Sequence, residues 1–285
     1  MSDTVYLNGE YLPRNKAFIS ADDRGFQFAD GVYEVIKCYG GIPFRMEDHL
    51  QRLKNSLREI RIRYQDVDHF PAVLNRLLDV NGLAGKEAAV YVQITRGSHF
   101  RVHHFPVIAS PTVYAFAFPF PSLTRWQEEG IRVVTADDIR WLRCDIKSVS
   151  LLPNTMLYQQ AVEQGAGECL LVREGMITEA THSSVMGIKG GTLVTHPLSP
   201  LILPGITRKV ILEICRENAI PVREEPVPLD QLPTLDEFML TGTGSEVIPI
   251  VQVDDLIISQ GVPGAVTRFL QQKFFQKVKM ECGLL

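Results

Sequence analysis

The sequence predicts an α+β protein built from two mixed α/β domains, and three observations indicate this fold class. Short β-rich runs recur along the 285 residues and are separated by Asn-Gly, Glu-Gly and Gly-Gly turns. Longer segments between them carry apolar residues every three or four positions, which is the spacing of amphipathic helices. The proline-containing stretch PFPSLTRW divides the chain, so the predicted domains are residues 1–120 and 121–285.

The N-terminal half is predicted to contain hairpins, two helices and two further strands. The dipeptides at residues 8–9 and 40–41 accept the positive φ angles of tight turns, so each is expected to join two antiparallel strands. A leucine stripe predicts a helix over residues 46–60, and a second helix is predicted over residues 70–80 before an Asn-Gly stop. The runs AAVYVQITRG and PTVYAFAFPF are typical of strands.

The C-terminal half repeats this mixture in a different order. A strand is predicted in IRVVTADDIRW, and a helix over residues 153–163 has proline in its first turn. Two hairpins are expected to turn at residues 174–175 and 190–191. A helix opens in GITRKVILEICREN, strands surround the Gly/Thr turn of DEFMLTGTGSEVIPIVQVDD, and GAVTRFLQQKFFQKV closes the chain as a helix.

Composition limits the classes of function. Apolar residues make up 45% of the chain, charged residues 22%, and the net charge is -4, so no excess basic charge is available for nucleic acid. The N-terminus lacks the apolar core of a secretion signal and no run of about 18 apolar residues occurs, so we expect a cytoplasmic protein without membrane spans. The five scattered cysteines predict reduced thiols and no metal site.

Four short stretches carry residues that could perform chemistry. Lys147, in WLRCDIKSVSLLPNTM, is expected to follow a strand, and an uncharged lysine amine can form an imine with an aldehyde. Glu179 follows another strand and could hold a protonated ring nitrogen. The helix start at residues 205–207 and the turn at residues 240–246 could each bind a phosphate through free N–H groups and hydroxyls.

Each of these stretches also has an ordinary structural explanation. Lysine is commonly a surface residue, a carboxylate at a strand end can be solvated, and Gly-x-Thr at a helix start is a common cap. A Gly/Thr sequence can be a plain turn. Taken together, however, an amine, a carboxylate for a ring nitrogen and two phosphate-binding segments fit a single ligand, pyridoxal 5'-phosphate.

Seven motifs give the chain a resemblance to a known family. The stretches DRGFQFADGVYEVIK, HLQRL, RWLRCDIKSVSLL, ITEATHSSV, GIKGGTLVTHP, ILPGITR and TGTGSEVIPI occur in this order. Together they resemble the class IV, or fold type IV, pyridoxal-phosphate aminotransferases, and among these the bacterial D-amino acid aminotransferases most. The resemblance covers nearly the whole chain and implies the two-domain architecture of that fold.

The resemblance also implies roles for individual residues. Lys147 would be the Schiff-base lysine and proton carrier, placed in the C-terminal domain with most phosphate contacts. Glu179 would pair with the pyridinium nitrogen. The residues implied to hold the phosphate are Arg52, Ile206, Thr207 and Thr243. Arg52 lies off the leucine stripe of its predicted helix, where a solvated arginine would look the same.

Substrate recognition is implied for three further residues. The motif RGSHFRVHHFP contains Arg101 and His103, and GVYEV contains Tyr33. In the D-amino acid enzymes these residue types hold the substrate carboxylate, and an arginine fork suits that group. An exposed basic loop is the alternative interpretation. The sequence departs from the family pattern at Pro204 and in EATHSSV, where His182 is interpreted as a structural, hydrogen-bonded histidine.

These inferences predict a ping-pong transaminase that moves the amino group of a D-amino acid such as D-alanine to a 2-oxo acid such as 2-oxoglutarate. The alternatives are a branched-chain L-amino acid aminotransferase, an (R)-amine transaminase, an aminodeoxychorismate lyase and a non-catalytic relative. The resemblance further implies a homodimer with the active site near the interface. Its expected small-molecule partners are an amino acid and a 2-oxo acid.

Overall fold

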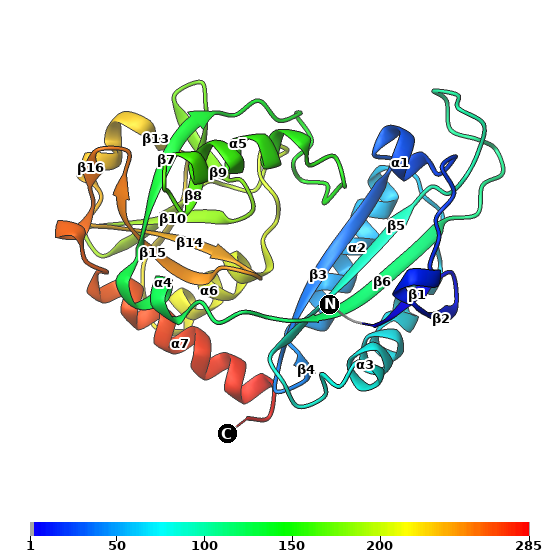
Figure 1. The fold of residues 1–285 in the computed structure, drawn as a ribbon. Helices are drawn as coiled ribbons and strands as arrows, with labels where there is room; N and C mark the ends of the chain where they lie inside the picture. The colour runs from blue at the N-terminus through cyan, green and yellow to red at the C-terminus, as the bar shows by residue number, and fades with distance from the viewer. Residues whose placement is uncertain (1–2, 285) are drawn as a thin grey trace. The chain divides into compact units, whose positions relative to one another are not determined.

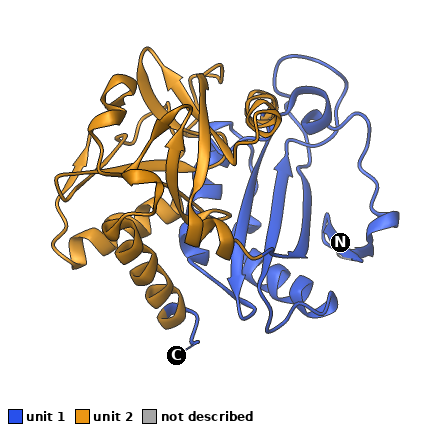
Figure 2. Cartoon of the chain, turned by 60° about the vertical axis from the view of Figure 1, so that its left-hand side comes forward, with its two compact units in different colours: residues 1–121, 146–150, 281–285 blue, residues 122–145, 151–280 orange. Residues whose placement is uncertain are grey.

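The computed structural model describes residues 3–284, which form two compact units (Figures 1 and 2). Among the described residues, unit 1 contains residues 3–121, 146–150 and 281–284, and unit 2 contains residues 122–145 and 151–280. The division into folding domains at residue 120 stays a prediction. By contacts within the structure, residues 146–150, which include Lys147, group with unit 1.

Unit 1 is built on a six-stranded sheet with the order β2-β1-β6-β5-β3-β4. Its neighbouring strands are antiparallel throughout. The strands are β1 (Thr4–Leu7), β2 (Glu10–Pro13), β3 (Gly31–Tyr39), β4 (Ile42–Pro43), β5 (Ala88–Thr95) and β6 (Thr112–Pro119). The helical elements are η1 (Arg14–Lys16), α1 (Arg24–Phe28), α2 (Met46–Glu59), η2 (Asp66–His69) and α3 (Phe70–Val80).

The predicted turns and helices of unit 1 are confirmed. Asn8 and Gly9 have φ angles of 49° and 98°, as a tight turn between β1 and β2 requires. The apolar stripe of α2, represented by Leu53, packs with Leu74 of α3 and Val90 of β5 in one buried core. Because strand side chains alternate between faces, this core fixes which side chains of β3 point towards the helices.

Unit 2 contains a ten-stranded mixed sheet with the order β12-β11-β10-β14-β15-β7-β8-β9-β13, and β16 pairs with β15. Strand β7 runs parallel to both of its neighbours, β15 and β8. The strands are β7 (Ile131–Asp137), β8 (Glu168–Arg173), β9 (Met176–Ala180), β10 (Ser184–Lys189), β11 (Thr192–Thr195), β12 (Val222–Glu224), β13 (Val227–Pro228), β14 (Glu237–Gly242), β15 (Glu246–Val253) and β16 (Leu256–Ile257).

The remaining helices belong to unit 2. They are α4 (Thr124–Glu129), α5 (Leu152–Glu163), α6 (Ile206–Glu217), η3 (Leu229–Thr234), η4 (Ser259–Gly261) and α7 (Ala265–Glu281). Only the last residue of α7, Glu281, is grouped with unit 1. The predicted helices in this half are confirmed. The predicted linker is partly wrong in structure, because its last three residues, 124–126, begin α4. Local sequence did not reveal this turn of helix, which contacts β15.

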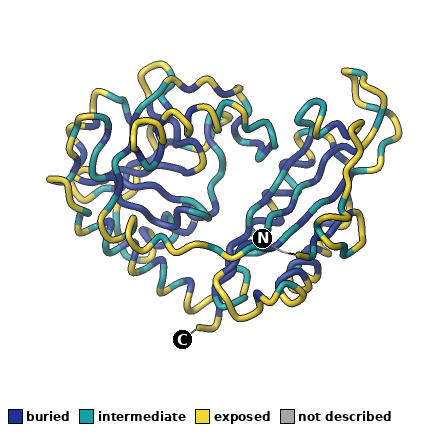
Figure 3. The backbone as a smooth tube through the Cα atoms, viewed as in Figure 1, coloured by how far each residue is buried: buried dark blue, intermediate teal, exposed yellow. Residues whose placement is uncertain are grey.

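Burial follows the predicted apolar pattern (Figure 3). All five cysteines are buried free thiols, and burial raises the pKa of Cys38 and of Cys169 to about 12.

Within residues 3–284, no helix combines the length and the apolar character that crossing a membrane would require.

Candidate active site

Lys147 lies in an irregular segment and not at the end of a strand, so that part of the prediction is wrong. Strand β7 ends at Asp137, ten residues earlier, and only an isolated bridge at Ser148 has strand character. The segment is fixed by backbone pairing with β3 and by a hydroxyl of α2. The bonds run from Tyr33 N to Lys147 O at 3.0 Å, from Val149 N to Gly31 O at 3.1 Å, and from Lys147 N to Ser56 Oγ at 3.2 Å.

The amine of Lys147 lies over an aromatic ring. Its Nζ atom is 4.2 Å from the ring centroid of Tyr33, which is a cation–π distance. Tyr33 in turn stacks on Tyr91 of β5, with ring centroids 5.6 Å apart. Two predicted site residues, one proposed to carry the cofactor and one to bind substrate, are therefore neighbours in unit 1.

Arg52 is a buried partner of Glu34 and not a solvated helix residue. Its Nε donates to Glu34 Oε1 at 2.7 Å and its Nη2 donates to Glu34 Oε2 at 2.9 Å. His49, three residues before Arg52 on α2, places Nδ1 2.8 Å from Glu34 Oε2. The Glu34 side chain is fully buried, so two side chains of one helix satisfy one strand carboxylate.

The charges of this triad explain its protonation. Burial acts to raise the pKa of Glu34, but the adjacent Arg52 and His49 outweigh it and hold the pKa well below the ordinary value. Burial lowers the pKa of His49, Glu34 opposes this, and the positive charges of Arg52 and Lys147 lower it further. At neutral pH the triad is therefore a carboxylate, a neutral imidazole and a guanidinium.

Because His49 is buried and neutral, we expect the protein to lose stability on acidification. Below a pH of about 6.5, His49 binds a proton in the unfolded chain but remains neutral in the folded chain. The free energy of unfolding therefore falls by up to about 1.4 kcal/mol per pH unit. The depressed pKa of Glu34 adds a second loss at lower pH. We expect His49→Gln to reduce the fall in unfolding free energy between pH 7 and 5.5, measured by urea denaturation.

The matched control for this measurement is His69→Gln, because His69 is an exposed histidine of the same unit. It should leave the pH dependence as in the unsubstituted protein. An equal flattening in both variants would contradict the assignment to His49.

Arg101 and His103 lie in the segment between β5 and β6, and both contact Phe28 of α1. The guanidinium carbon of Arg101 is 4.9 Å from the ring centroid of Phe28, and the His103 ring lies edge-on to Phe28 at 5.5 Å. Arg24 donates to the Val102 carbonyl between them at 2.6 Å. The structure thus places these two predicted carboxylate-binding residues together over Phe28, both exposed, while Tyr33 lies beside Lys147.

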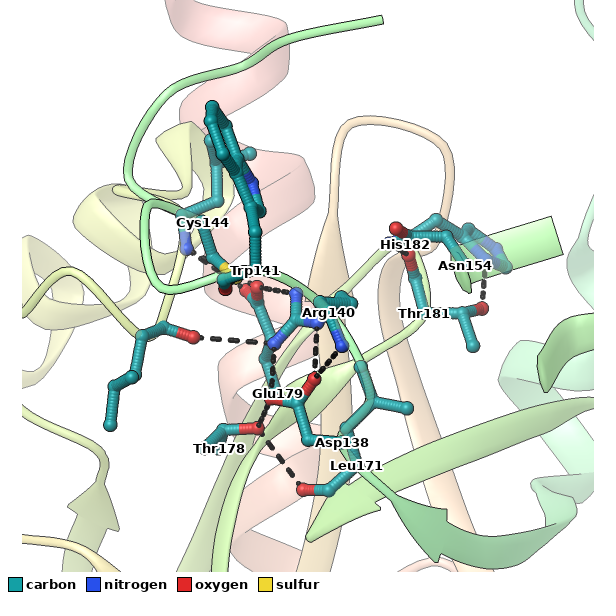
Figure 4. A network of polar contacts seen from close by, with 12 residues as sticks. Asp138, Arg140, Trp141, Cys144, Asn154, Leu171, Thr178, Glu179, Thr181 and His182 are labelled. Carbon is teal, nitrogen blue, oxygen red and sulfur yellow. Dashed lines mark hydrogen bonds and ion pairs between the residues drawn. The ribbon is translucent and has the colours of Figure 1, made fainter. Parts of the chain in front are cut away.

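Glu179 is a buried carboxylate of β9 in unit 2 (Figure 4). Arg140 Nη1 donates to its Oε1 at 2.5 Å, and the backbone N–H of Leu203 lies 3.1 Å from its Oε2. Burial raises the pKa of Glu179, and the charge and hydrogen bond of Arg140 oppose that rise. A carboxylate in this environment gains from any further cationic partner, such as a protonated ring nitrogen.

Ile206 and Thr207 open α6, where the N–H groups receive no side-chain cap from Gly205. Gly205 has an ordinary φ of -65°, so it is required here for space and not for backbone freedom. A Cβ atom at Gly205 would lie 2.7 Å from Ser184 Oγ. The helix start is therefore a cradle lined by N–H groups and a hydroxyl, as anion binding requires.

The second predicted phosphate segment joins this cradle. Ser184 of β10 pairs in register with Thr241 of β14, whose buried Oγ1 has no hydrogen-bond partner among the described residues. Gly242 and Thr243 follow directly, and a Cβ atom at Gly242 would approach Ser183 Oγ to 3.2 Å. Small residues and hydroxyls thus line both segments, so the donors and the space of unit 2 fit a phosphate group.

His182 has the structural role that the sequence favoured. Its Nδ1 lies 2.7 Å from Oε2 of the fully buried Glu168, and its ring meets Tyr158 edge-on at 5.1 Å. Thr181 also donates its hydroxyl to Glu168. The hydrogen bond of His182 is with the Thr181 hydroxyl, at 3.1 Å, so the departure in EATHSSV places one hydrogen-bond donor and one histidine ring beside a buried acid.

Several residues of the site were missed by sequence reasoning. Glu34 and His49 carried a usable signal, because β3 alternation places Glu34 on the core face and His49 shares a helix face with Arg52. A buried acid needs partners, so this triad could have been predicted. Asp138 and Arg140 lie in a loop without periodicity, and no local pattern points to them.

Comparison with known proteins decides the family. The family model described as amino-transferase class IV matches residues 31–253. The chain belongs to the class IV aminotransferases. The family and fold predicted from the sequence are therefore confirmed, and the chain is an aminotransferase by family.

Several relatives of this class IV chain are similar over nearly their whole length. The chain is 41% identical to the D-alanine aminotransferase of Bacillus licheniformis, covering 94% of each chain. It is 40% identical to the D-alanine aminotransferase of Staphylococcus haemolyticus, over 95% of this chain and 96% of that one. Among solved structures, the branched-chain amino acid aminotransferase of Escherichia coli superposes with a TM-score of 0.90 at 27% identity, covering 97% of this chain and 94% of that one.

Proposed function

We propose that this class IV aminotransferase transfers the amino group of a D-amino acid, such as D-alanine, to a 2-oxo acid such as 2-oxoglutarate. The similarity to D-alanine aminotransferases over about 94% of each chain carries this proposal. It is supported by the presence of Tyr33, Arg101 and His103, the residue types that the sequence resemblance assigns to the substrate carboxylate.

We propose pyridoxal 5'-phosphate as the cofactor, because the buried Glu179 carboxylate fits its ring nitrogen and the hydroxyl-lined start of α6 fits its phosphate. When bound, this cofactor supplies the aldehyde for the amine and the electron sink for the reaction. Lys147 would hold it covalently and Glu179 would pair with its ring nitrogen. The residues proposed to hold its phosphate are Arg52, Ile206, Thr207 and Thr243.

Lys147 would carry out the proton transfer of the reaction. Its amine is on a short segment held by backbone hydrogen bonds, and it can take a proton from the substrate Cα atom and deliver it to the cofactor. Tyr33 beside it restricts the direction of the amine. Arg101 and His103 would bind the substrate carboxylate, and the charge-assisted bonds of an arginine fork orient that group.

A homodimer is part of the proposal. Phe100, Val107 and Ile108 are 86–100% exposed in unit 1, near Arg101 and His103 in sequence. Exposed apolar side chains clustered in one loop are typical of a surface that another chain covers. A cytoplasmic location is also proposed, because all five cysteines are free buried thiols, as is usual in a reducing compartment.

The test is the absorbance spectrum of the purified protein, followed by addition of D-alanine or, separately, L-leucine. We expect a visible band from bound cofactor that D-alanine bleaches, with pyruvate released when 2-oxoglutarate is present. Bleaching by L-leucine alone would make the protein a branched-chain enzyme, consistent with its solved structural neighbour. Absence of any band after adding pyridoxal phosphate would overturn the cofactor assignment.

A further inference from the structure

We infer that Arg140 is a positioning residue that keeps the Glu179 carboxylate anionic and in one orientation before a cationic ring nitrogen arrives. The inference rests on the proposed function, because it concerns the same ring-binding carboxylate. Arg140 contacts Glu179, and no contact with substrate or reacting atoms is proposed for it, so it acts through Glu179.

The donors of Arg140 are distributed between two acids. Nη1 donates to Glu179 Oε1, while Nε and Nη2 donate to the two oxygens of Asp138 at 2.8 and 2.9 Å. Nη2 also reaches the carbonyl of Leu201 at 3.2 Å. The guanidinium plane is thus fixed by a two-bond fork to Asp138, and the remaining edge is directed at Glu179 (Figure 4).

Asp138 is itself held from several directions. The backbone N–H of Arg140 donates to its Oδ1 at 3.1 Å and the Thr178 hydroxyl donates to its Oδ2 at 3.0 Å. Arg173 of β8 lies 3.2 Å from Oδ1. Although burial acts to raise the pKa of Asp138, Arg140 and then Arg173 outweigh it and lower the pKa. Asp138 is therefore a permanent anion that orients Arg140.

The charge balance shows what Arg140 contributes. The side chains that interact with Glu179 are Arg140, Asp138 and Cys144, and Arg173 adds a second guanidinium group beside Asp138. The Cys144 thiol is uncharged because burial raises its pKa to about 11. Two carboxylates and two guanidinium groups sum to zero. Without Arg140, two buried acids would share one cation that touches only Asp138, and Glu179 would take up a proton more readily.

A protonated Glu179 would bind a cationic ring poorly, because it would first have to release its proton. This cost diminishes as the pH rises, so loss of Arg140 should make ring binding dependent on pH. Loss of a merely structural residue would weaken binding equally at all pH values. The pH profile therefore separates the two roles.

The experiment compares Arg140→Met with Arg173→Met, a matched control. Arg173 also pairs with Asp138, but the contacts of the described residues do not join it to Glu179. The probe is pyridoxamine phosphate, which forms no covalent bond with Lys147. Its dissociation constant is measured by equilibrium dialysis from pH 6 to 8.5, with the thermal midpoint of each ligand-free variant as a check of folding.

We expect Arg140→Met to bind the probe at least about 10-fold more weakly than the unsubstituted protein at pH 6.5, which corresponds to about 1.4 kcal/mol. The deficit should shrink towards pH 8.5. Arg173→Met should keep the pH profile of the unsubstituted protein. Parallel profiles for both variants, or an unchanged affinity in Arg140→Met, would overturn the inference.

Two further arms keep the result decisive. If Arg140→Met does not fold, Arg140→Gln, which is uncharged but retains a hydrogen-bond donor, is measured with the same two expectations. Arg140→Lys, which keeps the charge, should restore the flat pH profile in a folded protein, and a profile like that of the uncharged variant would overturn the inference. If the unsubstituted protein binds no pyridoxamine phosphate, the proposed function itself fails, which is a distinguishable outcome.

Discussion

Replacing Lys147 by alanine is expected to lower kcat for transamination by at least about 10⁴-fold. The substitution removes both the amine that would hold the cofactor and the group that would move the proton, and proton transfer alone contributes up to about 10⁴. Turnover of D-alanine with 2-oxoglutarate is the measurement. The backbone N–H of Lys147 donates to the Ser56 hydroxyl and its carbonyl accepts from the Tyr33 N–H, so the fold around the lost side chain should persist.

Two variants accompany this measurement. Lys147→Arg keeps a cation beside Tyr33 but provides no nucleophilic amine, so it should be as inactive as the alanine variant. Lys189→Ala alters an exposed lysine at the end of β10 and should retain activity. Near-normal transamination by Lys147→Ala would exclude Lys147 as the catalytic amine.

Replacing Glu34 by glutamine is expected to cost about 3–5 kcal/mol of unfolding free energy in unit 1. The substitution removes one partner of a buried ion pair and leaves the Arg52 guanidinium without its anion in an apolar core. Glutamine keeps only one acceptor oxygen, so Arg52 would retain at most one of its two bonds to residue 34, and cofactor affinity should fall as well. Urea denaturation combined with hydrogen exchange of β3 and α2 amides measures the effect within this unit.

Glu10→Gln is the matched control, because Glu10 is an exposed glutamate on β2 of the same sheet. It should change the unfolding free energy by less than about 0.5 kcal/mol. A loss below about 1 kcal/mol for Glu34→Gln would show that the triad contributes little to the stability of unit 1.

The sequence by itself determined the elements that depend on near neighbours. The Asn8-Gly9 turn needs only two adjacent residues that accept positive φ, and the helix over 46–59 needs only apolar residues at three- and four-residue spacing. The start of the helix at Ile206, directly after Gly205, could likewise be predicted from neighbouring residues alone. The residue types proposed for the cofactor were recognisable because their motifs follow a family order.

Only the tertiary structure decided how those residues are held. Arg52 hydrogen-bonds to Glu34, which is 18 residues away in the sequence, and Arg140 hydrogen-bonds to Glu179, which is 39 residues away. Lys147 lies on an irregular segment that pairing with β3 fixes, whereas the local pattern predicted a position directly after a strand. The physical reason is that a buried charge is stable only with its partners, and partners are chosen by packing in space and not by spacing along the chain.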